Sequence, residues 1–484
     1  MGQRPPGRRS TPGPAVLIPS SGSHRGADRG FALVEARSDV GDGTSKGSTA
    51  LLHTGFDSPP GTLEARLVRR GYQLLSRYAG PAGIAVERTG ALLVAWTPQE
   101  LAALPELAGK AAVNGYADCQ IVEAAQVRRQ LPALAPGALG GLSVPGESVL
   151  CSWTTVLALA TDALARGADV LVNHRVTRAS RGPDGITTLH CQTTPHCQTA
   201  PHGQTAPHRQ AGAGNGRARW VVNAAGLHAD DLDAVFGHNR ITVTPRRGEL
   251  LVFDKQARSL ADVIVLPVPT SRGKGVLISP TIYGNLMLGP TAEDCTDKSA
   301  TGTSGAGFAF LLERAAALMP ALLDEEVTAS YAGLRPAIGR GDYAIEVDAA
   351  RRYVLAGGIR STGISASMAI GEHVRELLGG AGLELAPRAG LPSPPRMPNL
   401  GEAFTRPFAD AAAIAADPAY GRIMCFCERV TAGEIRNALA APIPPADLSG
   451  LRRRTRAMNG RCQGFYCGAQ VAALMGRGKA EGSS

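Results

Sequence analysis

The sequence predicts an α/β fold of the dinucleotide-binding type, followed by a small cysteine-containing module. Short apolar strands alternate with helical stretches over about the first 380 residues, the order that produces a sheet covered by helices. Glu35 ends an early strand, where such folds place the carboxylate that accepts ribose hydroxyl groups. Two close pairs of cysteines follow a proline-rich stretch near the C-terminus, which indicates a second folding unit.

Composition limits the class of protein. The chain has 484 residues with 44% hydrophobic content, enough for two or three folded units. The net charge is +9, but no basic motif with interleaved aromatic residues is present. This favours anionic small molecules or an acidic redox partner over nucleic acid as the binding partner. No apolar run of 18 residues and no signal-peptide apolar region is present. We expect a cytoplasmic protein.

The elements follow one another in a regular order. Residues 1–14 are rich in Arg, Pro, Gly and Ser and are expected to be disordered. Strands are predicted at 15–18, 31–35, 88–96, 169–172, 219–226 and 353–356, with several more between 240 and 290. Helices are predicted at 61–79, 153–165 and 307–318, and from Gly357 to about Leu378. Residues 15–385 are therefore expected to form the main domain.

A degenerate six-residue repeat interrupts this pattern between residues 190 and 210. It places His190, His196, His202 and His208 at equal spacing. Such an array can bind metal weakly, but the Thr, Pro and Gln residues between the histidines cannot pack a core. We interpret 190–212 as a low-complexity insertion between two strands.

The second unit begins after a proline-rich linker. Residues 386–418 contain four prolines between 392 and 398, and such stretches extend rather than fold. The module at 419–476 is therefore expected to be a separate appendage, with a tail at 477–484.

Four cysteines in this module predict a metal centre. Cys425-Phe-Cys427 and Cys462-Gln-Gly-Phe-Tyr-Cys467 offer soft thiolates, and the segment between them is long enough to bring the pairs together. Zinc is the alternative, but zinc sites usually space their ligands C-x2-4-C, so we favour an iron-sulfur cluster. The other five cysteines are scattered, which suits a reducing compartment: they are Cys119, Cys151, Cys191, Cys197 and Cys295.

Two helices are predicted to begin close to these cysteines. Thr431-Ala-Gly-Glu434 forms a capping box that opens a helix to about Leu439. A second helical stretch follows Cys467, and N–H groups at helix starts favour thiolates. Five arginines between 452 and 461 either add positive charge beside the cluster or form a solvated basic face.

The module resembles a known family. Residues from about Tyr420 to Met475 combine the C-x-C pair, a V-T-x-x-E-I stretch and the C-x4-C pair. This combination resembles the bacterioferritin-associated-ferredoxin-like 2Fe-2S domain. The resemblance implies that Cys425, Cys427, Cys462 and Cys467 bind a 2Fe-2S cluster.

The main domain carries a second resemblance, based on five stretches in the right order. They are Val34 to Arg37, Gly43 to Gly55, Val222 to Gly226, Tyr331 to Pro336 and Gly357 to Gly363. Residues 31–380 resemble FAD-dependent oxidoreductases of the D-amino-acid-oxidase and glycerol-3-phosphate-dehydrogenase superfamily, especially the anaerobic glycerol-3-phosphate dehydrogenase large-subunit group. The resemblance implies a Rossmann-like FAD-binding domain interleaved with an antiparallel-sheet substrate subdomain at about 90–145 and 240–335.

The chain departs from this family before Phe31. The expected G-x-G-x-x-G turn would bind the FAD pyrophosphate through backbone N–H groups and a helix dipole. Only Gly22, Gly26 and Gly30 are present there, and their spacing is different. Either FAD affinity is weakened, or the first residues come from a wrong reading frame or start; we favour the second interpretation.

The resemblance also implies roles for individual residues. His53 is a candidate base, and Arg335 and Arg360 are candidates for a clamp that binds an anionic substrate. Thr362, Gly363 and Ser365 lie where a helix start could stabilise reduced flavin. The full set of cofactor-binding candidates is Glu35, Thr44, Ser45, Gly226, Gly358, Thr362, Gly363 and Ser365.

The functional hypothesis is an FAD-dependent dehydrogenase of a small anionic alcohol. The resemblance favours glycerol 3-phosphate as the substrate. Lys274 beside Arg272 slightly favours a phosphate over a carboxylate, with a plain basic loop as the alternative interpretation. Electrons would leave through the 2Fe-2S cluster to a quinone-linked or protein acceptor. The alternatives are an FAD-dependent 2-hydroxy-acid or amino-acid oxidoreductase, and a non-enzymatic iron-sulfur binding remnant.

Overall fold

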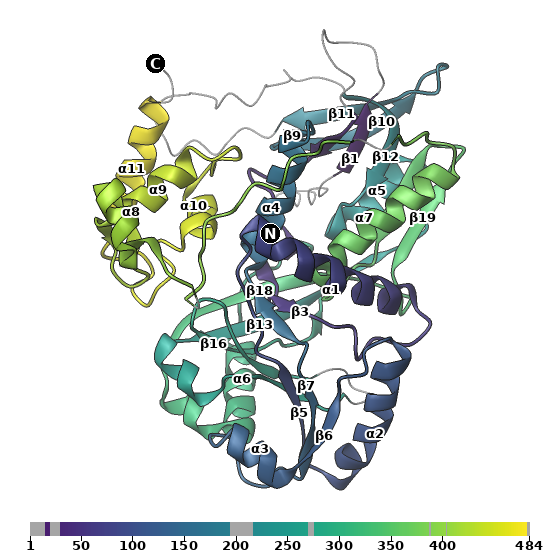
Figure 1. The fold of residues 1–484 in the computed structure, drawn as a ribbon. Helices are drawn as coiled ribbons and strands as arrows, with labels where there is room; N and C mark the ends of the chain where they lie inside the picture. Colours follow the sequence, from purple (N-terminus) through teal and green to yellow (C-terminus); the bar gives the residue numbers. More distant parts are fainter. Residues whose placement is uncertain are drawn as a thin grey trace, which may run out of the picture.

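The computed structural model describes residues 15–19, 30–193, 216–269, 275–386, 389–402 and 404–481. The candidate residues Gly22, Gly26, Arg272 and Lys274 lie outside these ranges, as do the last three histidines of the repeat. The main domain consists of two lobes, and the C-terminal module lies beside the upper lobe in Figure 1. None of the described helices is long and apolar enough to cross a membrane.

The upper lobe is a sheet with helices on both faces. Alternate residues of its strands point to opposite sides. Val34 and Val221 pack with α5, whereas Leu33 packs with α4 and Val222 with α7. Its strands are β1 (Ala15–Pro19), β2 (Ala32–Val34), β9 (Asp169–Leu171), β10 (His174–Arg181), β11 (Thr187–Thr193), β12 (Gly216–Asn223), β19 (Ala344–Asp348) and β20 (Tyr353–Gly357). Its helices are α1 (Leu63–Ala82), α4 (Ser152–Ala165), α5 (Ala229–Val235) and α7 (Gly363–Gly380).

The first strand runs in an unexpected direction. β2 is parallel to β9, and β12 is parallel to β20, as in a dinucleotide-binding sheet. β1 lies between β2 and β12 but is antiparallel to both, with Ala15 opposite Val34 and Asn223. A parallel crossover usually carries a helix, whereas residues 20–31 hold three glycines and three serines. Because β1 and β2 run in opposite directions, Pro19 lies at the end of the sheet that is away from Glu35.

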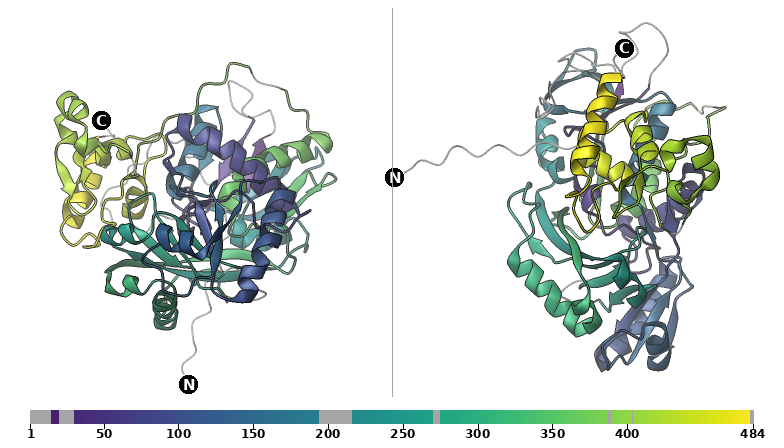
Figure 2. Two further views of the ribbon diagram at one scale, coloured as in Figure 1. Left: turned by 60° about the horizontal axis from the view of Figure 1, so that its bottom comes forward. Right: turned by 90° about the vertical axis from the view of Figure 1, so that its left-hand side faces the viewer.

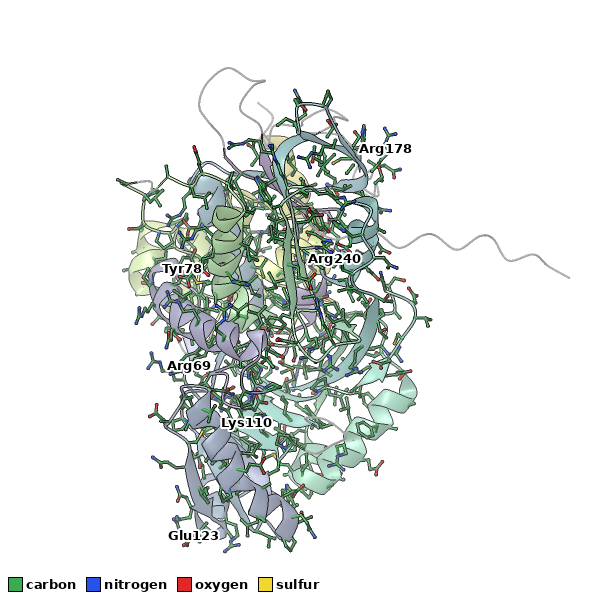
Figure 3. The ribbon with its side chains drawn as sticks, turned by 90° about the vertical axis from the view of Figure 1, so that its right-hand side faces the viewer. Arg69, Tyr78, Lys110, Glu123, Arg178 and Arg240 are labelled. Atoms are coloured by element: carbon green, nitrogen blue, oxygen red, sulfur yellow. The ribbon has the colours of Figure 1, made fainter. Side chains whose placement is uncertain are left out.

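The lower lobe is a mostly antiparallel sheet with helices packed on it. This is the antiparallel substrate sheet that the resemblance implied. Its strands are β5 (Ala91–Ala95), β6 (Gln120–Glu123), β7 (Gly140–Val144), β13 (Val243–Phe253), β14 (Ile264–Pro267), β15 (Leu277–Pro280), β16 (Leu286–Gly289), β17 (Glu293–Asp294) and β18 (Val327–Ile338). Its helices are α2 (Pro98–Val113), α3 (Ala124–Gln130) and α6 (Gly305–Leu318). Figure 3 shows this lobe from the side, with Lys110 and Glu123 on it and Arg178 and Arg240 on the upper lobe.

The two lobes are joined by more than one segment. β13 and β18 pair over their whole length, from Val243 opposite Ile338 to Phe253 opposite Val327. A small sheet of β3 (Leu51–Leu52), β4 (Val86–Glu87) and β8 (Ser148–Leu150) lies between the lobes. α1 packs along α7, with Leu67 and Val68 against Ala366 and Ala369. The space between the lobes is therefore bordered by paired strands and packed helices.

The C-terminal module has its own small core, which includes Cys425 and Cys467. Its elements are α8 (Ala411–Ala416), β21 (Ile423–Cys425), β22 (Val430–Thr431), α9 (Ala432–Leu439), α10 (Leu448–Thr455) and α11 (Gly468–Glu481). The predicted capping box is present: Thr431 Oγ1 accepts from the Glu434 N–H, and the Glu434 carboxylate accepts from the Thr431 N–H. The predicted helix end at Leu439 is also confirmed.

The module is not a separate appendage, so that expectation is wrong. Figure 2 shows it lying against the rest of the molecule. The Asp39 carboxylate of the upper lobe accepts hydrogen bonds from Arg453 and Arg454 of α10, and all three side chains are buried. The preceding linker is also attached, because Leu400 packs with Ala85 and Ile282. Burial of these groups fixes the module on the upper lobe.

Candidate active site and iron-sulfur module

A cavity of about 360 Å³ lies between the two lobes, at the carboxyl ends of β12 and β20. Ligands of open α/β sheets bind at this edge of the sheet. The cavity brings together six of the residues predicted from sequence. They are Thr44, Ser45, Gly226, Arg335, Arg360 and Gly363.

Two glycines allow the lobes to approach closely at this cavity. A Cβ atom on Gly47 would lie 2.9 Å from the Gly333 Cα, and one on Gly333 would lie 2.6 Å from the Gly47 carbonyl oxygen. Both residues line the cavity. Backbone contact of this kind is possible only without side chains, so the loop before β3 can form a wall against β18.

The first turn of α7 is held by a buried carboxylate that the sequence analysis missed. Glu64 of α1 accepts a hydrogen bond from Thr362 Oγ1 at 2.6 Å and one from Arg360 Nη2 at 2.6 Å. Tyr343 OH lies 2.6 Å from the same Thr362 oxygen. The Thr362 side chain is therefore occupied within the protein, and what α7 offers the cavity is the positive end of its backbone dipole at Gly363.

Two of the predicted cofactor residues shape the site without lining the cavity. Gly358 has φ of +66°, and a Cβ there would lie 2.4 Å from Ile338 Cδ1, so it forms the tight turn after β20. Ser365 is fully buried, and its Oγ accepts a hydrogen bond from the His53 backbone N–H at 2.9 Å. Ser365 therefore fixes the His53 loop against α7.

His53 is oriented by a second carboxylate that was not predicted. Its Nδ1 lies 2.9 Å from Glu147 Oε2, and Glu147 is fully buried. The other carboxylate oxygen, Oε1, accepts from the backbone N–H and hydroxyl of Thr54. A carboxylate at Nδ1 favours the imidazole tautomer that carries its proton on Nδ1. No local pattern around Glu147 identifies it, because the contact joins residues 94 positions apart.

The two candidate clamp arginines have different partners. Arg360 Nη2 donates to Glu64 and to the Gly341 carbonyl oxygen. Arg335 of β18 donates through Nη2 to the Thr291 carbonyl oxygen at 2.8 Å. Burial and the neighbouring Arg246 lower the pKa of Arg335. Among the described residues no carboxylate forms an ion pair with Arg335; Asp294, which pairs with Arg246, attracts its charge only from a longer distance.

Glu35 occupies the position that the sequence predicted, at the end of β2. Its side chain is buried, and Oε1 accepts a hydrogen bond from the Arg37 N–H at 2.8 Å. Burial raises the pKa of this carboxyl to about 7. A ribose hydroxyl donating to Glu35 would supply the polar partner that a buried carboxylate requires.

The described residues suit some parts of the FAD molecule better than others. The glycine-lined cavity suits the flavin half, and Glu35 suits the ribose. The reversed β1 carries the chain away from the pyrophosphate position, because Ala15 rather than Pro19 lies beside Val34. Of the three glycines considered for the phosphate loop, only Gly30 is described, and it precedes β2.

The four cysteines of the module lie together as two pairs. Cys427 shares a hydrogen bond with Cys462, and Cys467 shares one with Cys425. The backbone N–H groups of residues 464–466, Tyr466 above all, lower the pKa of Cys462, which favours the thiolate that a metal binds. Among the described residues no group of three or more His, Cys, Asp or Glu side chains surrounds a single metal position.

This arrangement bears on the choice between zinc and iron. A structural zinc ion requires four ligands around one position, whereas a 2Fe-2S cluster has four thiolates distributed over two irons. Two adjacent cysteine pairs, which also interact electrostatically with each other, therefore fit the cluster better. The fold and the cavity define a two-lobed flavin oxidoreductase, and the cysteine pairs add an iron-sulfur module.

The comparison with known families agrees with this class. Residues 24–377 match the family of FAD dependent oxidoreductases, so the chain belongs to that family. Residues 423–477 match the BFD-like [2Fe-2S] binding domain. The protein is therefore an FAD-dependent oxidoreductase with a 2Fe-2S domain, and both family resemblances seen in the sequence are confirmed.

Individual relatives are similar over most of the chain. A glycerol 3-phosphate dehydrogenase of Caloramator mitchellensis is 28% identical over 453 residues, which is 92% of this chain and 88% of the relative. A glycerol 3-phosphate oxidase of Mycoplasma pneumoniae is 28% identical and covers 72% of this chain and 87% of its own length. The solved L-alpha-glycerophosphate oxidase of Mycoplasma pneumoniae, with FAD bound, has a TM-score of 0.66 at 25% identity, and the match covers 75% of this chain and 91% of that one.

Proposed function

We propose that this protein is an FAD-dependent dehydrogenase that oxidises glycerol 3-phosphate and passes the electrons to its 2Fe-2S cluster. The observation that carries the proposal is Arg335, a guanidinium in the wall of the cavity whose hydrogen-bond partner among the described residues is one carbonyl oxygen. A partly buried charge of this kind requires an anion, and guanidinium groups bind phosphate in a two-pronged geometry. The relatives named above act on glycerol 3-phosphate.

Bound FAD supplies the hydride acceptor, and the protein supplies orientation and charge. Arg335 binds the substrate phosphate. His53 accepts the hydroxyl proton at Nε2, since Glu147 holds Nδ1 and stabilises the imidazolium that forms. The start of α7 would present the positive end of its helix dipole to the bound cofactor. Cys425, Cys427, Cys462 and Cys467 are the proposed cluster ligands.

The closest rival substrate is a 2-hydroxy acid, because a guanidinium also binds carboxylate. Bovine mitochondrial L-2-hydroxyglutarate dehydrogenase is 26% identical, but the match covers only about half of each chain. The Caloramator relative matches over nearly the whole chain. Phosphate is therefore the preferred anion.

The experiment is anaerobic mixing of the purified holoprotein with single candidate substrates. Glycerol 3-phosphate should bleach the flavin absorbance, whereas glycerol, L-2-hydroxyglutarate and L-proline should leave it unchanged. Glycerol has the alcohol but lacks the phosphate, so it tests whether the phosphate is required. Bleaching by L-2-hydroxyglutarate alone would replace the proposed substrate, and purified protein with iron but no FAD would instead support the binding-module alternative. Turnover with artificial one-electron acceptors and with quinones then distinguishes the classes of acceptor.

A further inference from the structure

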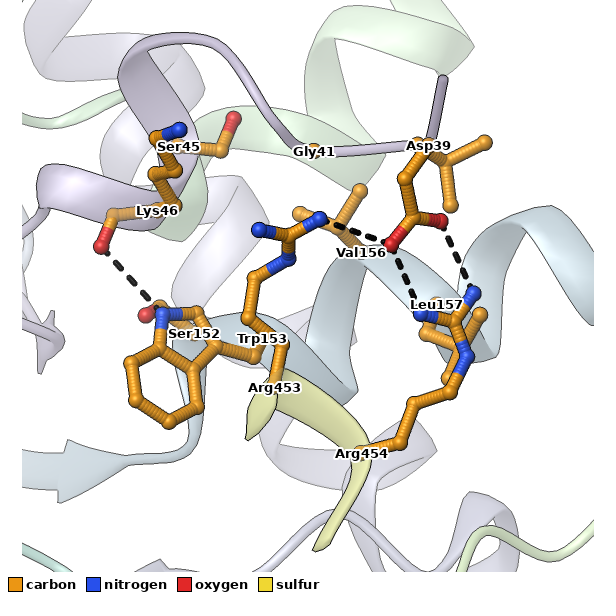
Figure 4. Close-up of a pocket in the computed structure, with 11 residues that line it drawn as sticks. Asp39, Gly41, Ser45, Lys46, Ser152, Trp153, Val156, Leu157, Arg453 and Arg454 are labelled. Carbon is orange, nitrogen blue, oxygen red and sulfur yellow. Dashed lines mark hydrogen bonds and ion pairs between the residues drawn. The ribbon is translucent and has the colours of Figure 1, made fainter. Parts of the chain in front are cut away.

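A column of packed side chains, partly buried at Trp153 and Tyr283 and buried at Arg456, connects the wall of the FAD cavity with the cysteine loops. It begins at Trp153, whose Nε1 donates to the Lys46 carbonyl oxygen at 3.2 Å. Lys46 lies between Ser45 and Gly47, which both line the cavity. Figure 4 shows this hydrogen bond beside the arginines of the module. The column therefore starts one residue from the cavity surface.

The column continues through a second aromatic ring. Trp153 stacks on Tyr283 with ring centroids 5.4 Å apart and an interplanar angle of 27°. Tyr283 OH lies 3.0 Å from Cys151 Sγ, at the start of α4, whose Thr155 and Val156 line the cavity. The Tyr283 hydroxyl is thus held by the residue that precedes α4.

Arg456 completes the column on the side of the module. Its guanidinium carbon lies 4.0 Å from the Tyr283 ring centroid. Arg456 Nε donates to Glu428 Oε2 at 2.9 Å, and both side chains are buried. Glu428 follows Cys427 directly. One cation thus contacts the aromatic ring of the main domain and the loop that carries a predicted cluster ligand.

Buried ion pairs keep this contact in place. Arg454 donates twice to Asp39, at 2.6 and 2.8 Å, and Arg453 donates once at 2.8 Å. Figure 4 shows both guanidinium groups converging on this carboxylate. Separating these buried partners would leave charged groups without their counter-ions. These ion pairs therefore favour the docked position of the module.

We propose that Trp153, Tyr283 and Arg456 form the electron-transfer contact between bound FAD and the 2Fe-2S cluster. Electronic coupling falls steeply across gaps, and these side chains fill the space by van der Waals contact. The proposal rests on the electron route of the proposed function. Two electrons leave the reduced flavin one at a time, and each reduces one ferric ion of the cluster. A one-electron acceptor outside the chain reoxidises the cluster after each transfer, the protons enter water, and the three side chains keep their oxidation state.

The test uses photoreduction of FAD in the anaerobic holoprotein, so that the electrons do not depend on the substrate. Electron arrival at the cluster is followed by absorbance and by the paramagnetic signal of the reduced cluster. Tyr283→Leu and Trp153→Leu should slow this transfer at least tenfold, a barrier increase of about 1.4 kcal/mol. Tyr283→Phe keeps the ring and should restore the rate. Flavin and iron contents should match the wild type in each variant.

A second variant covers the case in which the leucine variants do not fold. Asp39→Asn leaves the column side chains unchanged but weakens docking, so it should speed proteolysis within 386–418 and slow the transfer. A wild-type rate of electron transfer in a folded Tyr283→Leu variant would overturn the proposal. A wild-type rate in Asp39→Asn would also overturn it if proteolysis shows that docking is weakened. Failure of glycerol 3-phosphate to bleach the flavin would reject only the proposed substrate.

Discussion

Arg335 and Arg360 illustrate how two residues with the same predicted role differ once their partners are known. Both line the cavity, but Arg360 is bound to the buried Glu64, whereas the one hydrogen bond that Arg335 donates within the described part of the chain goes to a carbonyl oxygen. The sequence identified both arginines through the family stretches. It could not distinguish them, because Glu64 and Arg360 lie 296 positions apart.

Arg335→Ala is expected to raise KM for glycerol 3-phosphate far more than it lowers kcat. Hydrogen bonds to charged groups contribute about 1.5–3 kcal/mol, so KM should rise roughly 10- to 100-fold. Steady-state kinetics with an artificial acceptor measures this. Arg340→Ala is the matched control, since Arg340 is exposed and pairs with Glu346 outside the cavity. Equal kinetics for the wild type and Arg335→Ala would remove Arg335 from the substrate site.

Cys427→Ser is expected to abolish the 2Fe-2S absorbance while FAD binding remains. Cys427 pairs with Cys462 in the module, and a hydroxyl is a poor replacement for a soft thiolate ligand. Iron content and the visible spectrum of the purified protein measure the effect. Cys295→Ser is the control, because Cys295 lies in the lower lobe beside Glu293, outside the module. Full cluster content in Cys427→Ser would reject this residue as a ligand.

Glu35 predicts a pH dependence of apoprotein stability. Burial raises its pKa from 4.5 to about 7. Between these two pH values the folded state keeps a proton on Glu35 that the unfolded state has lost. Stability must therefore fall as pH rises through this window, by about 3 kcal/mol in total. Glu35→Gln should remove that part of the decline. The free energy of unfolding from urea titrations at pH 5 and pH 8 tests this, and an unchanged difference in the variant would contradict it.

At the scale of elements, local patterns predicted most helices and the position of the first strand, but not the direction of that strand. The predicted helix at 153–165 is α4, Ser152–Ala165, and that at 307–318 is α6, Gly305–Leu318. α2 was missed, although Thr97 and Glu100 form a capping box at its start. The direction of β1 could not be predicted, because it depends on pairing with β12, about 200 positions away.

The packing of α1 on α7 predicts opposite effects for two glycines of the same helix. A Cβ on Gly71 would lie 2.1 Å from the Ser365 carbonyl oxygen and 2.7 Å from Ala366 Cα, whereas one on Gly80 meets nothing within 4 Å. Alanine favours helix over glycine by about 1 kcal/mol. Gly80→Ala should therefore stabilise the protein by up to that amount.

Gly71→Ala should destabilise it by about 1–3 kcal/mol, the usual cost of overpacking, because backbone atoms must move. It should also weaken FAD binding, since the first turn of α7 borders the cavity. Thermal unfolding and FAD content of both variants are the measurements. Equal stabilisation by the two substitutions would show that α1 can shift without affecting α7.

At the scale of the whole molecule, the sequence predicted two units but not their contact. The arginines between 452 and 461 could be assigned either to the cluster or to a solvated face. The structure shows a third role: Arg453 and Arg454 bind Asp39, more than 400 positions away, and Arg456 packs on Tyr283. Such pairings are invisible to local patterns, because they exist only after both units have folded and docked.

The reversed β1 leads to a prediction about FAD affinity. A pyrophosphate normally accepts N–H hydrogen bonds from a glycine loop and a helix start, and β1 directs the chain away from that position. Two lost bonds to a charged group cost about 3–6 kcal/mol. Replacing residues 1–30 with a strand, G-x-G-x-x-G turn and helix of the family pattern should therefore lower the FAD Kd at least roughly 100-fold.

Flavin fluorescence titration of the apoprotein measures this Kd, with iron content as the control, because the module lies far along the chain and should load equally in both proteins. Equal and tight FAD binding by the unaltered chain would mean that other residues hold the pyrophosphate. In that case the flavin half of the site, with Arg335 and the start of α7, would be sufficient for the cofactor. Weak binding by the unaltered chain would instead make the first strand the element that limits FAD loading, and with it electron delivery to the cluster.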